Sequence, residues 1–400
     1  MSAEATDNVN SMFKTIASVP SWTMRQMNKL SKLDLSNMMQ HLSPGPVLNA
    51  TAGAGTRAMQ GMRVSMSPPA AGAAFTEIKN KGGVYLLVRQ NKRALEIPTP
   101  TPHPFPIDTY LERAYEREDY AALWAVEGLG HLFGENQLDA GDTSEATNLL
   151  GGSGADGLSA KSMLMLHAGI GLAYAQRLLG ELNTQPSDEE ILEATRKIFE
   201  LCRQNSRPSH LGATVESLGL VTRTFESKLL SQVDRAVEEL EPQWRGYFWH
   251  GVGRALYFLP LNFLPCSTWE AVEMATRESV DDISRHNLYA GVGWAMAMVN
   301  LRSPNVLTDL VIKPHGDKLL GNIWFQNGIA SALVMRQDTT PGTPLIQAFL
   351  DTTENSNDSK LQSQWETIVS APARKALDTT GPELLASDQI GRIFEYTELL

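Results

Sequence analysis

Polar side chains recur immediately before short clusters of small residues along this chain, and histidine is the most frequent of them. The recurring residues are Glu127, His167, His210, His250, Tyr289 and Asn327. Histidine changes charge near neutral pH, so histidines gathered at one end of a helical array could move protons or bind a metal ion. Each could equally hydrogen-bond a helix end or a loop carbonyl. Because no carboxylate stands at ligand spacing and His-Glu-x-x-His does not occur, we predict no metal ion, no other cofactor and no catalytic residue.

A ligand site is the alternative use of these polar groups. If the helices that carry the small residues form an inner layer, the polar residues meet at one rim of it, beside large aromatic side chains. Arg254 then lies slightly deeper than the rim. The ligand-binding residues predicted on this basis are Glu127, His167, His250, Arg254, Tyr257 and Trp294.

The small-residue clusters recur about every 40 residues. The first glycines of the clusters are Gly128, Gly169, Gly212, Gly251, Gly291 and Gly328. A period of this length is typical of stacked helical hairpins, with one hairpin in each repeat. The sequence therefore predicts an all-α fold of about six helical hairpins, each of about 40 residues, stacked as a solenoid. Closure of the array into an α/α ring is left open.

The glycines need a physical reason, because glycine inside a helix costs about 1 kcal/mol relative to alanine. Glycine and alanine stand four residues apart in several clusters, as in Gly251 with Ala255 and Gly328 with Ala332. Residues four apart share one helix face, so each helix presents a smooth strip to its neighbour. Leu132 and Glu216 depart from this pattern. We predict close helix packing, and not a dinucleotide site, whose glycines follow a buried strand and occur once.

Local signals place several helix boundaries. Ser187 and Ser267 each open a capping box, and the second predicts a helix that runs to Arg285. The pair Asp281-Asp282 is interpreted as a solvated face of that helix, because Arg285 breaks any aspartate-rich diphosphate motif. No Walker loop and no Gly-x-Ser-x-Gly elbow occurs.

Three parts follow from these patterns: an N-terminal arm over 1–106, a helical repeat domain over 107–336 and a C-terminal helical cap over 337–400. The arm contains an amphipathic helix over 21–42, a segment over 75–95 that is helix or hairpin, and a strap with proline at every second position over 98–106. The amphipathic helix either packs on its own core or binds a partner or a membrane surface. Its predicted contact residues are Trp22, Met24, Arg25, Met27, Lys29 and Lys32.

Composition limits the function classes. The chain has 400 residues, of which 42% are hydrophobic and 20% charged, and its net charge of −11 argues against a general nucleic-acid binder. Two cysteines are too few for a disulfide scaffold and fit a reducing compartment. No secretory signal and no long apolar run occurs. We therefore expect a cytoplasmic protein whose N-terminal helix could also touch a membrane.

Several segments, in order, resemble an uncharacterised bacterial family, a domain of unknown function found in enediyne-type biosynthetic gene clusters. These segments are 61–65, 124–132, 165–175, 247–258 and 289–297. The most specific stretch, Trp249 to Phe258, is similar to the family's Gly-x-Gly-Arg-x-Leu-Trp-Phe core. The resemblance departs at the proline strap and at the glycine-rich insertion after Gly134. It implies a biosynthetic context and carries no catalytic residue.

The leading functional interpretation is a non-catalytic helical-repeat scaffold or accessory protein that binds a protein partner, in the context of natural-product biosynthesis. The alternative is an enzyme or carrier that binds an apolar small molecule in a cavity lined by the glycine-bearing helices. The sequence defines neither the ligand nor the partner nor the oligomeric state.

Overall fold

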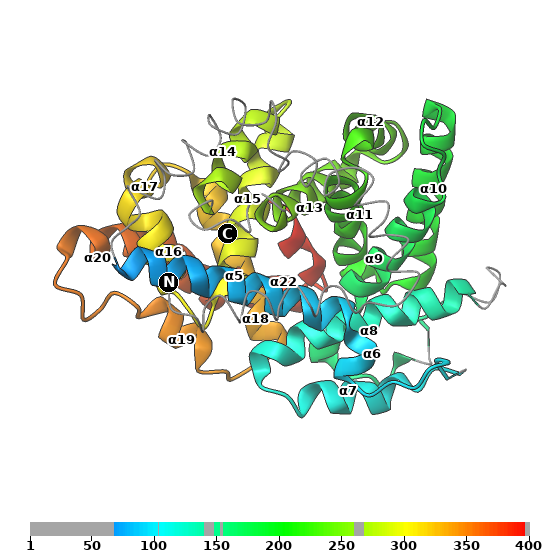
Figure 1. The fold of residues 1–400 in the computed structure, drawn as a ribbon, viewed down its shortest axis with the longest axis horizontal. Helices are drawn as coiled ribbons and strands as arrows, with labels where there is room; N and C mark the ends of the chain where they lie inside the picture. The colour runs from blue at the N-terminus through cyan, green and yellow to red at the C-terminus, as the bar shows by residue number, and fades with distance from the viewer. Residues whose placement is uncertain (1–67, 103, 140–147, 153–154, 260–267, 397–400) are drawn as a thin grey trace, which may run out of the picture. The chain divides into compact units, whose positions relative to one another are not determined.

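The computed structural model describes residues 68–102, 104–139, 148–152, 155–259 and 268–396 (Figure 1). By its internal contacts the chain divides into Met1–Val64 and Ser65–Leu400, and every described residue belongs to the second unit. All regular elements in the described ranges are helical, with no strand among them, which confirms the all-α prediction. None of these described helices is long and apolar enough to cross a membrane. The predicted amphipathic helix, with Trp22 to Lys32, lies outside the described residues.

Six glycine-bearing helices form an inner layer in which each helix packs on the next in chain order. They are apolar on almost every side, which is typical of helices that are buried all round. The last of them also touches the second. In order they are α8 (Asp119–Asp139), α9 (Met163–Gly180), α11 (Leu211–Phe225), α13 (Arg245–Phe258), α15 (Asp282–Asn300) and α18 (Ile323–Thr339).

Amphipathic helices alternate with the inner ones along the chain. Helices α10 (Asp188–Asn205), α12 (Leu230–Leu240) and α14 (Thr268–Glu278) each pack on the inner helices before and after them. The connection from α15 to α18 is broken into α16 (Asn305–Leu307), the π-helical turn η8 (Thr308–Ile312) and α17 (Lys313–Leu319). Such alternation is what the 40-residue period predicts for the middle of the chain.

Capping decides where two of these helices begin. Ser187 and Glu190 form the predicted capping box of α10. The prediction of one helix to Arg285 is wrong, because α14 ends at Glu278 and α15 starts at Asp282. Asp281 accepts a hydrogen bond from the amide of Ser284 and so caps α15, where its sequence interpretation was a solvated face.

The glycines lie where neighbouring inner helices touch. A Cβ added at Gly171, Gly219, Gly251, Gly291 or Gly328 would lie under 3.0 Å from backbone atoms of the adjacent inner helix. Nothing as large as a methyl group fits between these backbones. The predicted close packing is therefore confirmed, and the helix-propensity cost of the glycines is offset by contact between backbones.

The N-terminal part of the described chain is also helical. Helix α5 (Pro68–Arg89) settles the choice between helix and hairpin in favour of helix, and it packs on α8 and α15. Helices α6 (Asn91–Ala94) and α7 (Ile107–Tyr115) follow on either side of the proline strap. Although the sequence places α5 in the N-terminal arm, its contacts tie it to the inner layer.

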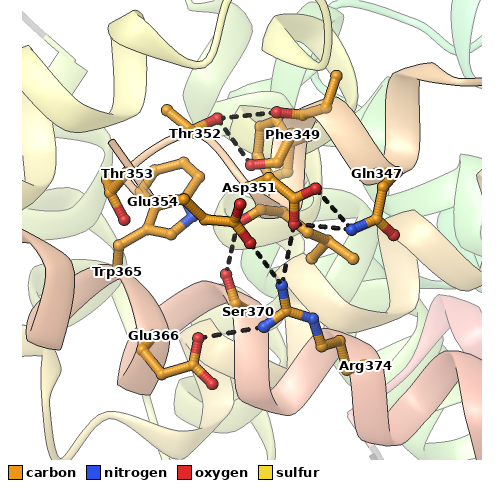
Figure 2. Close-up of polar contacts among 12 residues, drawn as sticks. Gln347, Phe349, Asp351, Thr352, Thr353, Glu354, Trp365, Glu366, Ser370 and Arg374 are labelled. Carbon is orange, nitrogen blue, oxygen red and sulfur yellow. Dashed lines mark hydrogen bonds and ion pairs between the residues drawn. The ribbon is translucent and has the colours of Figure 1, made fainter. Parts of the chain in front are cut away.

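After α18 the chain continues as short helices that pack partly on α18. Figure 2 shows how they are joined: Trp365 Nε1 and Ser370 Oγ both donate to the carbonyl of Leu350, at 3.1 and 2.8 Å. Arg374 lies 3.0 Å from Asp351 Oδ1. These elements are α19 (Leu345–Leu350), α20 (Ser359–Trp365), η9 (Glu366–Ser370), α21 (Ala371–Lys375), η10 (Ala376–Thr380), α22 (Gly381–Ala386) and η11 (Ile390–Phe394).

Candidate functional site

Five side chains from four inner helices meet in the interior, and we name them the central cluster. Helix α8 supplies Glu127, α11 supplies Glu216, α13 supplies His250 and Arg254, and α15 supplies Trp294. None of the five is more than 3% exposed. Four of them are among the six ligand-binding residues predicted from the sequence, and the structure brings those four together.

Arg254 is the hub of the central cluster. Its Nη1 lies 2.7 Å from Glu216 Oε2 and its Nη2 lies 3.3 Å from Glu127 Oε1. Its guanidinium carbon lies 4.2 Å from the centre of the Trp294 ring, in cation–π geometry. One cation therefore joins carboxylates from α8 and α11 and rests on an aromatic face from α15.

Glu216 and His250 form a hydrogen-bonded pair beside this hub, with 3.0 Å between Glu216 Oε1 and His250 Nδ1. Burial lowers the pKa of His250, although the Glu216 carboxylate opposes that shift. The neutral ring is thus favoured, and because Nδ1–H must donate to the carboxylate, Nε2 carries the lone pair. Burial also raises the pKa of Glu127, partly offset by Arg254.

Three buried polar atoms of the central cluster have no hydrogen-bond partner: His250 Nε2, Arg254 Nε and Trp294 Nε1. An unsatisfied buried polar group lowers the stability of the folded state by about 1–3 kcal/mol. Three such atoms in one cluster are therefore unfavourable if the cluster serves only to stabilise the structure. His250 and Trp294 are adjacent, with ring centres 6.4 Å apart. Chemically, the set offers one acceptor and two donors.

Tyr257 lies apart from the central cluster and belongs to an anchor for α5. Its hydroxyl donates to Glu77 at 2.6 Å, and Thr268 donates to the other oxygen of the same carboxylate, also at 2.6 Å. Lys81 pairs with Glu77 at 3.1 Å, and burial lowers the pKa of this lysine. Asn300 donates to the Tyr257 hydroxyl at 2.7 Å. These bonds fix α5 against α13, α14 and α15.

His167 also lies apart, and both of its ring nitrogens are used by backbone groups. Its Nδ1–H donates to the carbonyl of Met163 at 2.6 Å, and its Nε2 accepts from the amide of Arg207 at 3.1 Å. Its ring stacks on His210, which lines a small pocket of about 90 Å³ with Asp338 and other residues. The sequence left two roles open for His167: proton or metal chemistry, and hydrogen bonding to a helix end or a loop. The structure shows the second.

Two members of this region were not predicted as site residues: Glu216 and Phe394. Glu216 had a signal, because a carboxylate stands where four of the other repeats place an alanine. Phe394, whose ring centre lies 6.3 Å from that of His250, has no signal in the repeat pattern.

Across the part of the chain that the structure describes, no group of three or more His, Cys, Asp or Glu side chains could hold a metal ion.

Comparison with known proteins adds no family to this geometry. The resemblance to the enediyne-cluster family therefore stays a prediction. No family model matches the chain, and no significant match was found among curated proteins or solved structures.

Proposed function

We propose that this chain binds a small molecule at the central cluster, with an apolar or aromatic body and a hydroxyl group. The observation that supports the proposal is the set of three unpartnered atoms on His250, Arg254 and Trp294. A hydroxyl accepts hydrogen bonds from N–H groups and donates one to a lone pair, so it carries both the acceptor and the donor that these atoms lack. Binding of an apolar small molecule is the alternative interpretation of the sequence, and the hydroxyl group is the chemical detail that the structure adds to the proposal.

Acid–base chemistry is within reach of this arrangement. His250 Nε2 faces away from Glu216, and a base oriented by a carboxylate is the usual arrangement for taking a proton from a hydroxyl. Arg254 and Trp294 would then stabilise the oxygen that is left. We include this capacity in the proposal and name no reaction.

The test uses 1-naphthol, a fluorescent aromatic alcohol, as the probe. We expect saturable binding to the full chain, and a roughly tenfold loss of affinity in His250→Gln, because one buried hydrogen bond of about 1.4 kcal/mol is lost. His315→Gln, which changes a half-buried histidine stacked on Trp269, is the matched control and should bind as the wild type does. Equal affinity in His250→Gln and the wild type would contradict the proposal.

Partner binding remains the second candidate, supported by exposed apolar side chains at equivalent repeat positions. Val280 and Ile283 precede and begin α15, and Leu320 and Ile323 stand 40 residues later at the start of the adjacent α18. Their exposed fractions run from 41% to 67%. A protein partner or a second copy of the chain could cover this surface.

Sedimentation velocity tests the second candidate, first on the chain alone and then with any protein co-purified from its native source. We expect the double variant Val280→Lys/Ile323→Lys to associate at least tenfold more weakly than the wild type. Its unfolding midpoint should equal that of the wild type. Unchanged association of the double variant would exclude this surface.

A further inference from the structure

The C-terminal turn η11 occupies the space beside the central cluster. The ring of Phe394 lies 6.3 Å from that of His250 and 6.0 Å from that of Trp294, and the guanidinium of Arg254 lies 6.0 Å from it. Each of these three residues carries one of the unpartnered polar atoms of the central cluster. Phe394 is fully buried, so its ring fills the apolar side of the site.

We propose that η11 is a plug: it fills the ligand site at the central cluster and must be displaced before a ligand can enter. The inference rests on the proposed function. The plug supplies the apolar body that a ligand would have, but its phenyl ring supplies no hydroxyl, so the polar atoms beneath it stay unsatisfied. A ligand that brings both parts would therefore replace it favourably.

The way the plug is held fits displacement. Just after the plug, the amide of Tyr396 donates to Asn287 Oδ1 at 2.6 Å, so displacement of the plug breaks this bond to α15. Gly391 sits against the carbonyl of Ser209 and against Gly212, where a Cβ would lie 2.7 Å from a backbone oxygen. Asp388, just before the turn, has a positive φ of 55° and closes the end of α22, where the amide of Gln389 donates to the carbonyl of Leu384 at 2.8 Å; this helix end is the joint at the base of the plug. Figure 1 shows this red segment beside α13 and α11, which it contacts.

A close approach at Gly391 offers a variant that unseats the plug and keeps Phe394. In Gly391→Ala the added methyl group collides with the Ser209 carbonyl, so the turn cannot seat fully. Gln389→Ala changes an exposed side chain of the same segment and is the matched control. The probe is again 1-naphthol, mixed with protein in a stopped-flow fluorimeter.

We expect the wild-type binding rate to become independent of probe concentration, because opening of the plug limits it. Gly391→Ala should raise that limiting rate at least tenfold with equal or tighter affinity, and Gln389→Ala should not change it. Both variants should still lose affinity when His250→Gln is added.

Cross-linking provides a second arm if Gly391→Ala fails to fold. With Cys202 and Cys266 replaced by serine, Gly246→Cys and Glu395→Cys place thiols at a contact where the Glu395 carboxylate lies 3.2 Å from a Cβ built on Gly246. A cleavable bismaleimide should slow probe binding at least tenfold, and cleavage should restore it. The same reagent across Arg203→Cys and Glu241→Cys, an ion pair far from the plug in sequence, should have no effect.

The outcomes separate the two proposals. If the probe binds at His250 and neither Gly391→Ala nor the cross-link changes its rate, the plug is overturned and the ligand site stands. If His250→Gln leaves binding unchanged, or no variant binds the probe, both the ligand site and the plug are overturned.

Discussion

Gly219→Ala should destabilise the protein by about 3 kcal/mol or more, or prevent folding. The added Cβ would lie under 3.0 Å from the carbonyl of Phe248 and the amide nitrogen of Val252. Both are backbone atoms of α13, so no side chain can turn aside, and α11 and α13 must move apart. The better helix propensity of alanine returns only about 1 kcal/mol. Urea unfolding at pH 7 measures the change in the free energy of unfolding.

Gly83→Ala is the matched control for Gly219→Ala. Gly83 also lies inside a helix, α5, but a Cβ added there meets nothing within 4 Å. It should raise the free energy of unfolding by about 0.5–1 kcal/mol, because alanine restricts the unfolded chain and favours the helix. If Gly219→Ala were as stable as the wild type, the packing role assigned to the glycines would be wrong.

Glu216→Leu should destabilise the protein by about 3–5 kcal/mol. The substitution removes the carboxylate that lies 2.7 Å from Arg254 and leaves the buried guanidinium with Glu127, at 3.3 Å, as its one carboxylate partner. The double variant Glu216→Leu/Arg254→Met removes the uncompensated charge and should recover much of the loss. A double-mutant cycle by urea unfolding gives the coupling energy directly.

An exposed ion pair provides the reference for the Glu216 experiment. Lys360 and Asp317 lie 2.7 Å apart, and both side chains are more than 60% exposed. Lys360→Ala should change the free energy of unfolding by less than about 1 kcal/mol, because water screens such pairs. If the double variant at Glu216 and Arg254 proves less stable than Glu216→Leu alone, then Arg254 contributes through its cation–π contact with Trp294 more than through its charge pairing.

The inner layer could be predicted from the sequence because glycine within a helix is unfavourable without a compensating contact. A repeated cost at Gly169, Gly251, Gly291 and Gly328 therefore indicates a repeated contact. The same logic could not place the end of α14. An aspartate before an apolar run is compatible with both a solvated face and a cap, and only the bond from Ser284 to Asp281 decides between them.

The central cluster was predictable only in part. Glu127 and His250 each stand directly before the first glycine of a cluster, and Arg254 lies one helical turn after His250, so their place in the inner layer follows from the period. That Arg254 bonds Glu127 directly depends on how sharply successive helices turn, which no local pattern encodes. His167 lies two residues before Gly169 and Tyr257 six residues after Gly251, and the structure places the first at a loop amide and the second in the anchor of α5. Residues predicted to share one ligand site thus acquire different partners through long-range packing.

The anchor of α5 has a consequence for the order in which the molecule assembles. Contacts between successive inner helices join residues about 40 apart, so they close short loops and can propagate along the chain. The bonds from Glu77 to Tyr257 and Thr268 span 180 and 191 residues and close only after most of the polypeptide has been placed. During synthesis on the ribosome, α8 follows α5 closely and can cover part of it, but the face of α5 that docks on α13, α14 and α15 stays exposed until those helices have been made.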